Sequence, residues 1–259
     1  MRISIWMLSG ALALGALGAS AAAKPLPSYV TTALADPGRT DADRGQDQDR
    51  KPGDMVVFAG IKPGTKVVDL IPGQGYFTRI FAKAVGDKGF VYAFFPSNLD
   101  DFIKKRFSVA EVTTDVLGKP YKAYTNVAVL HAPIEKFVAP ELVDVVWTSR
   151  NYHDMHDTFF GPADLSKVNK AVFDALKPGG VFVVLDHAAE PGSGLRDTET
   201  LHRIDEAAVK KEVEAAGFKL VGESNLLRNS ADDHKAKVFD ASVRGKTDQF
   251  ILKFRKPAH

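Results

Sequence analysis

The stretch VVDLIPGQGYFTRI, from Val67 to Ile80, places a strand-like run directly before a helix-like run. The first run is apolar and β-branched, and it ends at Asp69. In the turn, Gly73 and Gly75 lack a Cβ, so the backbone can approach a ligand closely and its N–H groups can face that ligand. A tight strand-to-helix turn would need the same glycines, so this turn alone indicates a ligand site only weakly.

Short apolar runs and helix-like stretches alternate from Lys62 onward, which predicts a parallel sheet covered by helices on both faces. The predicted strands are Lys66–Leu70, Phe90–Phe94, Val127–Leu130, Val143–Trp147, Val181–Asp186, Lys219–Glu223 and Gln249–Phe254. The predicted helices are Tyr76–Val85, Asp101–Val116, Ala163–Leu176 and a helix capped by Asp205 that runs through Ala216, with Gly217 after it.

The last two predicted strands have no helix-length pattern between them, so we expect them to pair antiparallel. The connecting segment, Asn225 to Lys246, is long and polar, yet it contains Leu226, Leu227 and Phe239. Such a loop is usually functional, and we expect it either to close over a site or to be an ordered surface loop held by its own side chains.

The N-terminus has the pattern of a secretory signal peptide. Arg2 precedes an apolar run rich in Leu, Ala and Gly, and Ala19-Ser20-Ala21 fits a small-x-small cleavage site. We therefore expect a signal peptide over 1–23 and export to the periplasm or medium; an uncleaved membrane anchor is the alternative. A polar segment over 24–51 then leads into a single domain over 52–259.

Composition excludes several classes of function. The chain has 259 residues, 45% of them hydrophobic, and a net charge of +2, so we expect no nucleic-acid partner and no stable membrane insertion after cleavage. It has no cysteine, which excludes disulfides, a thiol nucleophile and cysteine-based zinc sites. We expect a small-molecule ligand, and the sequence leaves the oligomeric state open.

Five motifs in fixed order carry a resemblance: VVDLIPGQGYFT, VYAFFPSN, VDVVWTSRNYHDM, LKPGGVFVVLDH and VEAAGFKLV. Together they resemble a class I S-adenosylmethionine-dependent methyltransferase, most closely a bacterial group with a PGxGYFT turn and a NYHD segment. The likeness spans about 52–256. It implies a Rossmann-like, doubly wound α/β sheet of seven strands, the last antiparallel, with S-adenosylmethionine over the carboxyl ends of the first strands.

The resemblance also implies cofactor-binding residues in the opening turn. The family pattern is acid-x-Gly-x-Gly-x-Gly, which Asp69, Gly73 and Gly75 match, while Ile71 replaces the first glycine. Because Pro72 restricts the residue before it, we expect Ile71 to be extended and to place its bulk near the methionine portion of the cofactor.

The second strand departs from the family pattern. There the family usually has a carboxylate that accepts hydrogen bonds from both ribose hydroxyls, whereas this chain has Phe94, Phe95 and Pro96, then Ser97 and Asn98. The phenylalanines could stack on the adenine, and Ser97 or Asn98 could accept a neutral hydrogen bond. Loss of the charged bond costs about 1.5–3 kcal/mol, or roughly ten- to a hundredfold in affinity.

The segment NYHDMHD follows the fourth predicted strand, where the family places the acceptor. We predict that Asn151 and Tyr152 orient the substrate and that His153 is a general base, since imidazole titrates nearest neutral pH. The alternative is that Asp154 or Asp157 caps a helix and the histidines are exposed loop residues.

Four histidines, at 153, 156, 187 and 202, fall on loops that should converge at this edge. Their spacing matches no zinc signature, so the leading hypothesis, methyl transfer from S-adenosylmethionine to a small molecule, assigns no metal. One alternative is an exported binding module that uses the same pocket without turnover. Another is a metal-dependent hydrolase or lyase built on His153, His187 and His202.

Overall fold

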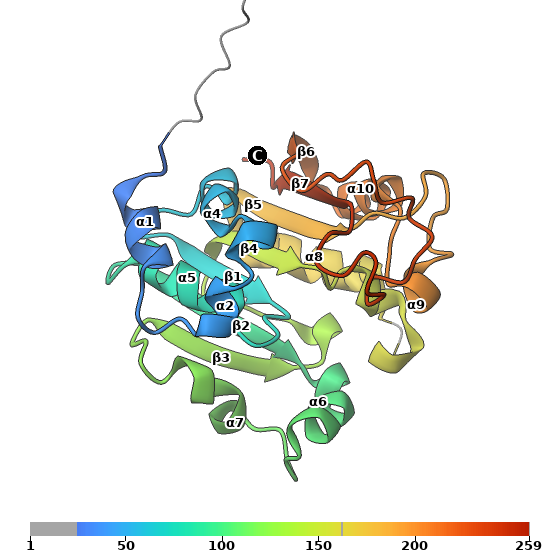
Figure 1. Ribbon diagram of the computed structural model, residues 1–259. Coiled ribbons are helices and arrows are strands. Elements are labelled where there is room, and N and C mark those ends of the chain that lie inside the picture. Colours follow the sequence, from blue (N-terminus) through green and yellow to red (C-terminus); the bar gives the residue numbers. More distant parts are fainter. Residues whose placement is uncertain (1–24, 162, 259) are drawn as a thin grey trace, which may run out of the picture.

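The computed structural model describes residues 25–161 and 163–258. The expected signal peptide over 1–23 lies outside the described residues. Seven strands form one sheet in the order β3-β2-β1-β4-β5-β7-β6 (Figure 1). β7 is antiparallel to both of its neighbours, and the other pairings are parallel. The strands are β1 (Lys66–Leu70), β2 (Phe90–Pro96), β3 (Val127–Ala132), β4 (Val143–Ser149), β5 (Leu176–His187), β6 (Lys219–Ser224) and β7 (Gln249–Arg255).

The fold class and all seven strands are therefore confirmed, including the antiparallel last strand. Helices cover both faces of the sheet (Figure 1). The helices are α1 (Ser28–Leu34), α2 (Asp41–Arg44), α3 (Asp47–Arg50), α4 (Pro52–Ala59), α5 (Tyr76–Val85), α6 (Asp100–Phe107), α7 (Thr114–Gly118), α8 (Leu165–Ala175), α9 (Thr198–Leu201) and α10 (Glu206–Ala215). Five 3-10 turns complete the described elements: η1 (Ser97–Leu99), η2 (Lys119–Tyr121), η3 (Ile134–Lys136), η4 (His153–His156) and η5 (Thr158–Phe160).

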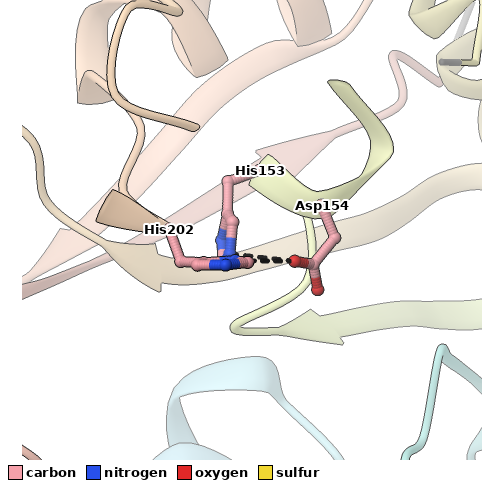
Figure 2. A group of neighbouring side chains, drawn as sticks. All are labelled: His153, Asp154 and His202. Carbon is pink, nitrogen blue, oxygen red and sulfur yellow. Dashed lines mark ion pairs between the residues drawn. The ribbon is translucent and has the colours of Figure 1, made fainter. Parts of the chain in front are cut away.

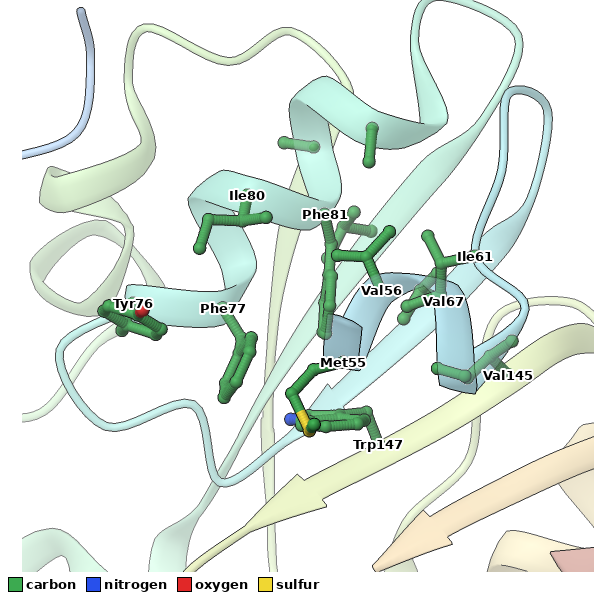
Figure 3. Close-up of a cluster of buried hydrophobic side chains, with 14 of the residues drawn as sticks. Met55, Val56, Ile61, Val67, Tyr76, Phe77, Ile80, Phe81, Val145 and Trp147 are labelled. Carbon is green, nitrogen blue, oxygen red and sulfur yellow. The ribbon is translucent and has the colours of Figure 1, made fainter. Parts of the chain in front are cut away.

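Two apolar clusters, one on each face, hold the helices to the sheet. On the first face, Phe77 and Phe81 of α5 pack edge-on against Trp147 of β4, with ring centroids 4.7 and 5.6 Å apart (Figure 3). On the second face, the ring of Phe218 lies 5.9 Å from that of Phe182 on β5. This packing fixes the β1–α5 turn over the carboxyl ends of the parallel strands.

One predicted helix is wrong in extent. The stretch 101–116 forms two helices, because Ser108 takes a left-handed backbone (φ 53°) that ends α6. The next helix starts afresh at Thr113, whose side chain accepts the Val116 N–H. By contrast, the predicted cap at Asp205 is confirmed: its carboxylate accepts the Ala207 N–H, and Gly217 after α10 has φ 101°.

The polar N-terminal stretch folds onto the domain as α1, α2 and α3. The guanidinium of Arg39 is buried and donates two hydrogen bonds to Asp47, at 2.9 and 2.5 Å. Asp43 and Arg79 are also buried and form a bidentate pair with both bonds at 2.8 Å. The Asp43–Arg79 pair joins the stretch to α5, so the stretch contributes to the site described below.

The segment 225–246 is an ordered loop fastened to the chain beside α9. Arg203, fully buried, forms a bidentate pair with Asp232 and also donates to the Ala236 carbonyl. The Val238 N–H donates to the Leu201 carbonyl at 3.1 Å. Across the two described ranges, we find no helix long and apolar enough to cross a membrane.

Candidate functional site

A cavity of about 770 Å³ opens at the carboxyl ends of β1, β2 and β4. This volume is within the range of about 300–1,000 Å³ that is typical of small-molecule sites. Its lining comes from the polar N-terminal stretch (Thr40, Ala42, Asp43, Gln46, Arg50), the β1–α5 turn (Asp69, Ile71, Pro72, Gly73, Gln74, Tyr76, Phe77, Arg79), Phe95, the α6–η2 segment (Ile103, Phe107, Val109, Val116, Leu117, Lys119, Pro120) and the end of β4 (Ser149, Arg150, Asn151).

The backbone of Ile71 contradicts the expected extended geometry. Its φ is 60°, a left-handed value that is a genuine outlier for a β-branched residue. Two hydrogen bonds impose it: the Ile71 N–H donates to the Phe94 carbonyl at 2.9 Å, and the Asn151 side-chain amide donates to the Ile71 carbonyl at 2.9 Å. Tertiary hydrogen bonds thus outweigh the local preference that Pro72 imposes. The side chain of Ile71 is largely buried in the second apolar cluster.

The two glycines of the turn have different reasons to be glycine. Gly73 has φ 58°, and a Cβ there would meet no heavy atom within 4 Å, so its backbone faces open cavity. Gly75 has φ 79°, and a Cβ there would lie 2.4 Å from the ring of Tyr121. Gly75 does not line the cavity; it permits close packing of Tyr121 rather than of a ligand.

Asp69 lies near the end of β1 and lines the cavity. Its Oδ2 accepts a hydrogen bond from the Thr78 hydroxyl at 2.6 Å. Burial raises the pKa of Asp69 to about 6, although the Thr78 bond and the charge of Arg50 act in the opposite direction. A positively charged or hydrogen-bond-donating ligand group would favour the ionised form.

Two arginines reach the cavity without a carboxylate partner among the described residues. Arg50 lies over the rings of Tyr76 and Phe77, 4.1 and 4.8 Å from their centroids, and donates to Ser149 Oγ at 3.3 Å. Burial and the charge of Arg150 lower the pKa of Arg50 to about 10. Arg150 Nε donates to Gln249 at 2.9 Å, while its Nη2 is buried without a hydrogen-bond partner.

The second strand brings only part of its predicted residues to the cavity. Phe95 lines it, whereas Phe94 points to the other face and packs on Phe137 at 4.9 Å, so the expectation that Phe94 stacks on adenine is wrong. Asn98 Oδ1 accepts the Ile134 N–H at 2.9 Å, which is a structural role. Ser97 and Asn98 begin the η1 turn and do not line the cavity.

The NYHD segment is divided between the cavity and the core. Asn151 lines the cavity, but the Tyr152 side chain is fully buried, and its hydroxyl donates to Glu212 at 3.0 Å and accepts from Asn169 at 2.8 Å. His153 is 2% exposed and also lies outside the lining. The structure therefore brings only Asn151 of the three predicted catalytic residues to the cavity.

His153 belongs to a separate polar cluster. Its Nδ1 is 2.8 Å from Asp186 Oδ1 and its Nε2 is 3.0 Å from Asp154 Oδ1. Burial acts to lower the pKa of His153, but the two carboxylates outweigh it and hold the pKa well above its usual value. His187 contacts Thr247 at 2.7 Å, and His156 lies 3.3 Å from Glu212.

Comparison with known proteins adds the family context. No protein-family model matches the chain. The ubiquinone/menaquinone biosynthesis C-methyltransferase UbiE of Vibrio cholerae is 26% identical over 204 residues, which are 76% of this chain and 64% of that protein. UbiE of Cronobacter sakazakii is 24% identical over 192 residues, 72% of this chain and 69% of that protein. The chain thus spans slightly less than two thirds of the first relative's length.

Solved structures share the fold. A SAM dependent methyltransferase from Aquifex aeolicus has a TM-score of 0.52 at 19% identity, covering 90% of this chain and 99% of that chain. The fold is that of the class I S-adenosylmethionine-dependent methyltransferases. The 1,6-didemethyltoxoflavin-N1-methyltransferase of Burkholderia thailandensis, solved with S-adenosylhomocysteine, has a TM-score of 0.52 at 14% identity. The match covers 84% of this chain and 81% of that chain. The [4+2]-cyclase SpnF has a TM-score of 0.53 at 15% identity, and the match covers 89% of this chain and 94% of that chain.

The cavity of this methyltransferase fold suits S-adenosylmethionine in most respects. Gly73 leaves room for close backbone approach, and Phe95, Tyr76 and Phe77 offer aromatic surface. Arg50 and Arg150, which line the cavity without a carboxylate partner among the described residues, suit a ligand carboxylate. What does not suit the cofactor is the second strand, because the lining has no free carboxylate for the ribose: Asp43 is engaged by Arg79, and Asp69 belongs to β1.

Sequence reasoning missed the N-terminal stretch and the α6–η2 segment as parts of the site. Arg50 and Asp43 lie in a run of mixed charges that is typical of a solvated surface, and their burial depends on partners far along the chain. Nothing in the run itself separates charges that become buried from charges that remain solvated. Arg150 was also missed, although it stands directly before the NYHD segment.

Proposed function

We propose that the protein binds S-adenosylmethionine in the 770 Å³ cavity and transfers its methyl group to a small-molecule acceptor. The observation that carries this proposal is the left-handed Gly73, whose open side faces the cavity at the first turn of a methyltransferase-type sheet. The cofactor supplies an electrophilic methyl group when bound. The chain's own residues position the reactants and exclude water.

Each cavity residue would have a distinct task. Asp69 and the backbone at Gly73 would hold the amino-acid portion, and Arg150 with Arg50 would bind its carboxylate. Asn151 would border the acceptor while it fixes the turn through the Ile71 carbonyl. Because Tyr152 and His153 lie outside the lining, the proposal assigns no general base among the NYHD residues, and an acceptor that is already deprotonated would need none.

Ligand-dependent stabilisation tests the proposal. S-adenosylmethionine and S-adenosylhomocysteine should raise the unfolding temperature of the purified protein in a concentration-dependent way, whereas NAD should not. Equal shifts with all three, or no shift with any, would contradict the cofactor assignment. Binding without turnover on any tested acceptor would favour a binding module, and the neighbour named as a [4+2]-cyclase illustrates that this fold is also found in a protein not named as a methyltransferase.

We also propose that the protein is exported. The basis is the pattern at 1–23, with Arg2 before the apolar run and small residues at 19–23. Intact-mass measurement on protein from the cell envelope or medium should give a chain that begins near Ala22 or Lys24. A full-length species extracted from membranes would contradict cleavage.

A further inference from the structure

A second polar cluster lies outside the cavity, on the loops that follow β4 and β5. His153 and Asp154 stand on the η4 turn, and His202 faces them from the end of α9 (Figure 2). One ligand-type atom from each of the three residues lies within 4.8 Å of the others. None of these three residues lines the 770 Å³ cavity.

We propose that His153, Asp154 and His202 bind one divalent transition-metal ion, with Asp157 as a further ligand. Donor atoms about 2.1 Å from a tetrahedral or octahedral ion lie about 3.0–3.4 Å from one another. Asp154 Oδ1 is 3.0 Å from His153 Nε2 and 3.5 Å from His202 Nδ1, and His202 Nδ1 is 3.7 Å from Asp157 Oδ2. These three spacings are within about 0.3 Å of those around such an ion, and the His153 and His202 donor atoms are within 4.8 Å of each other.

The buried carboxylate of Asp157 lies beside this cluster. Its side chain is fully buried, and its carboxylate has only weak partners among the described residues: the His202 imidazole at 3.7 Å and the Thr198 hydroxyl, neither of which meets strict hydrogen-bond geometry. The neighbouring Thr198 hydroxyl donates to the Leu195 carbonyl at 3.3 Å, and His202 stands beyond hydrogen-bond range. An ionised carboxylate that is buried with such weak partners is unfavourable, and a bound cation would stabilise its ionised form.

Asp186 has the arrangement of an outer carboxylate that orients a metal-binding histidine. Its Oδ1 lies 2.8 Å from His153 Nδ1, and its Oδ2 accepts the His153 backbone N–H at 2.8 Å. Such a partner fixes the tautomer in which Nε2 has a free lone pair directed at the ion. The second bond fixes the η4 turn to the end of β5, so the imidazole is held before any ion arrives.

The donor set indicates the class of metal. Two imidazoles with one or two carboxylates suit Zn, Fe(II), Mn or Ni, whereas Mg and Ca prefer oxygen donors throughout. The side chains of His202 and Asp154 are 16% and 20% exposed, so one side of the cluster is open to solvent. The exposed ring of Phe239 stands 5.0 Å from His202 at this opening.

A purely structural explanation accounts for only part of the cluster. A protonated His153 that bridges Asp154 and Asp186 would satisfy those two carboxylates without an ion. Asp157 would then be buried with two weak partners, the Thr198 hydroxyl and a His202 imidazole 3.7 Å away that also faces Asp154 at 3.5 Å. The metal hypothesis accounts for all four side chains and does not depend on methyl transfer.

Metal content and affinity test the proposal. Full-chain protein without a polyhistidine tag is treated with chelator and then dialysed against Zn²⁺ or Mn²⁺, and bound metal is measured by mass spectrometry. We expect one ion per chain. His202→Ala and the nearly isosteric Asp157→Asn should each weaken binding at least tenfold, and Asp186→Asn should weaken it about ten- to a hundredfold.

His131→Ala is the matched control, because it removes another half-buried imidazole with a carboxylate partner, Asp100 at 2.8 Å. It should leave metal affinity unchanged. Circular dichroism verifies that each variant is folded. If His202→Ala does not fold, Asp157→Asn still tests the proposal. The proposal is overturned if neither Zn²⁺ nor Mn²⁺ binds stoichiometrically. It is also overturned if wild type, His202→Ala and Asp157→Asn bind metal equally.

Discussion

The side-chain amide of Asn151 donates a hydrogen bond to the carbonyl oxygen of Ile71 at 2.9 Å, and so joins the NYHD loop to the β1–α5 turn. The same amide donates to the Ser149 carbonyl at 2.8 Å. Since Ile71 is held at φ 60°, which is costly for isoleucine by about 1–3 kcal/mol, this contact helps to maintain the strained turn at the cavity.

Asn151→Ala should therefore loosen the turn and weaken ligand binding. We expect a loss of about 1–3 kcal/mol in the free energy of unfolding and about tenfold weaker binding of S-adenosylhomocysteine. Asn126→Ala is the control, because Asn126 also donates to two carbonyls, those of Ala82 and Gly86, but does not line the cavity. Chemical unfolding and calorimetry measure both quantities. Equal effects of the two variants on binding would contradict the role of Asn151.

Gly73→Ala separates backbone strain from the ligand effect. Gly64 matches Gly73: its φ is 86°, a Cβ there meets nothing within 4 Å, and it lies outside the cavity. Each alanine should cost about 1 kcal/mol in the free energy of unfolding, since both positions are left-handed. Only Gly73→Ala should weaken binding, and Gly73→Val should abolish it. Unchanged affinity in Gly73→Val would exclude close approach of the ligand to this turn.

Asp69→Asn should change the pH dependence of stability. The pKa of Asp69 is raised from 3.8 to about 6 in the folded protein. Between about pH 4 and pH 6, the Asp69 carboxyl is therefore protonated in the folded protein and ionised in the unfolded chain. Stability from this group is then present below about pH 4 and is lost as the pH rises toward about 6, by up to about 3 kcal/mol. In Asp69→Asn, the free energy of unfolding should not fall over this pH range.

Urea unfolding between pH 4 and 7 measures the difference between wild type and Asp69→Asn. Asp87→Asn, at an exposed position, controls for the change in net charge. The same slope in wild type and Asp69→Asn would show that Asp69 is not the group responsible. At pH 7 the Asp69 variant should unfold at higher urea but bind S-adenosylmethionine less tightly, because it lacks the negative charge.

Arg150→Gln tests recognition of a ligand carboxylate. It should weaken S-adenosylhomocysteine binding about tenfold or more, because a charge-assisted hydrogen bond contributes about 1.5–3 kcal/mol. Methylthioadenosine has no carboxylate, so its affinity should be unchanged. Arg255→Gln, at the end of β7, is the control for charge. Equal weakening of both ligands by Arg150→Gln would indicate a general disturbance of the cavity rather than carboxylate recognition.

The fold was predictable because its signals are local. Strand patterns such as Lys66–Leu70 and the cap at Asp205 depend on residues next to each other in sequence, and the structure confirms both. The site was less predictable because it depends on distant partners. Pro72 indicates an extended Ile71, whereas the left-handed backbone, which suits the glycine of the family pattern, is held by bonds to Phe94 and Asn151 far along the chain. The burial of Tyr152 depends in the same way on Glu212 and Asn169.

Calorimetric titration with S-adenosylmethionine, on the purified wild type and on Phe95→Asp, measures directly whether the cavity binds the cofactor. We expect one binding site per chain in the wild type. We also expect roughly ten- to a hundredfold tighter binding in Phe95→Asp, which restores a ribose acceptor at the end of β2 at a cost in stability, because Phe95 is largely buried. No binding heat in either protein, at temperatures where both are folded, would contradict the assignment of this cavity to the cofactor.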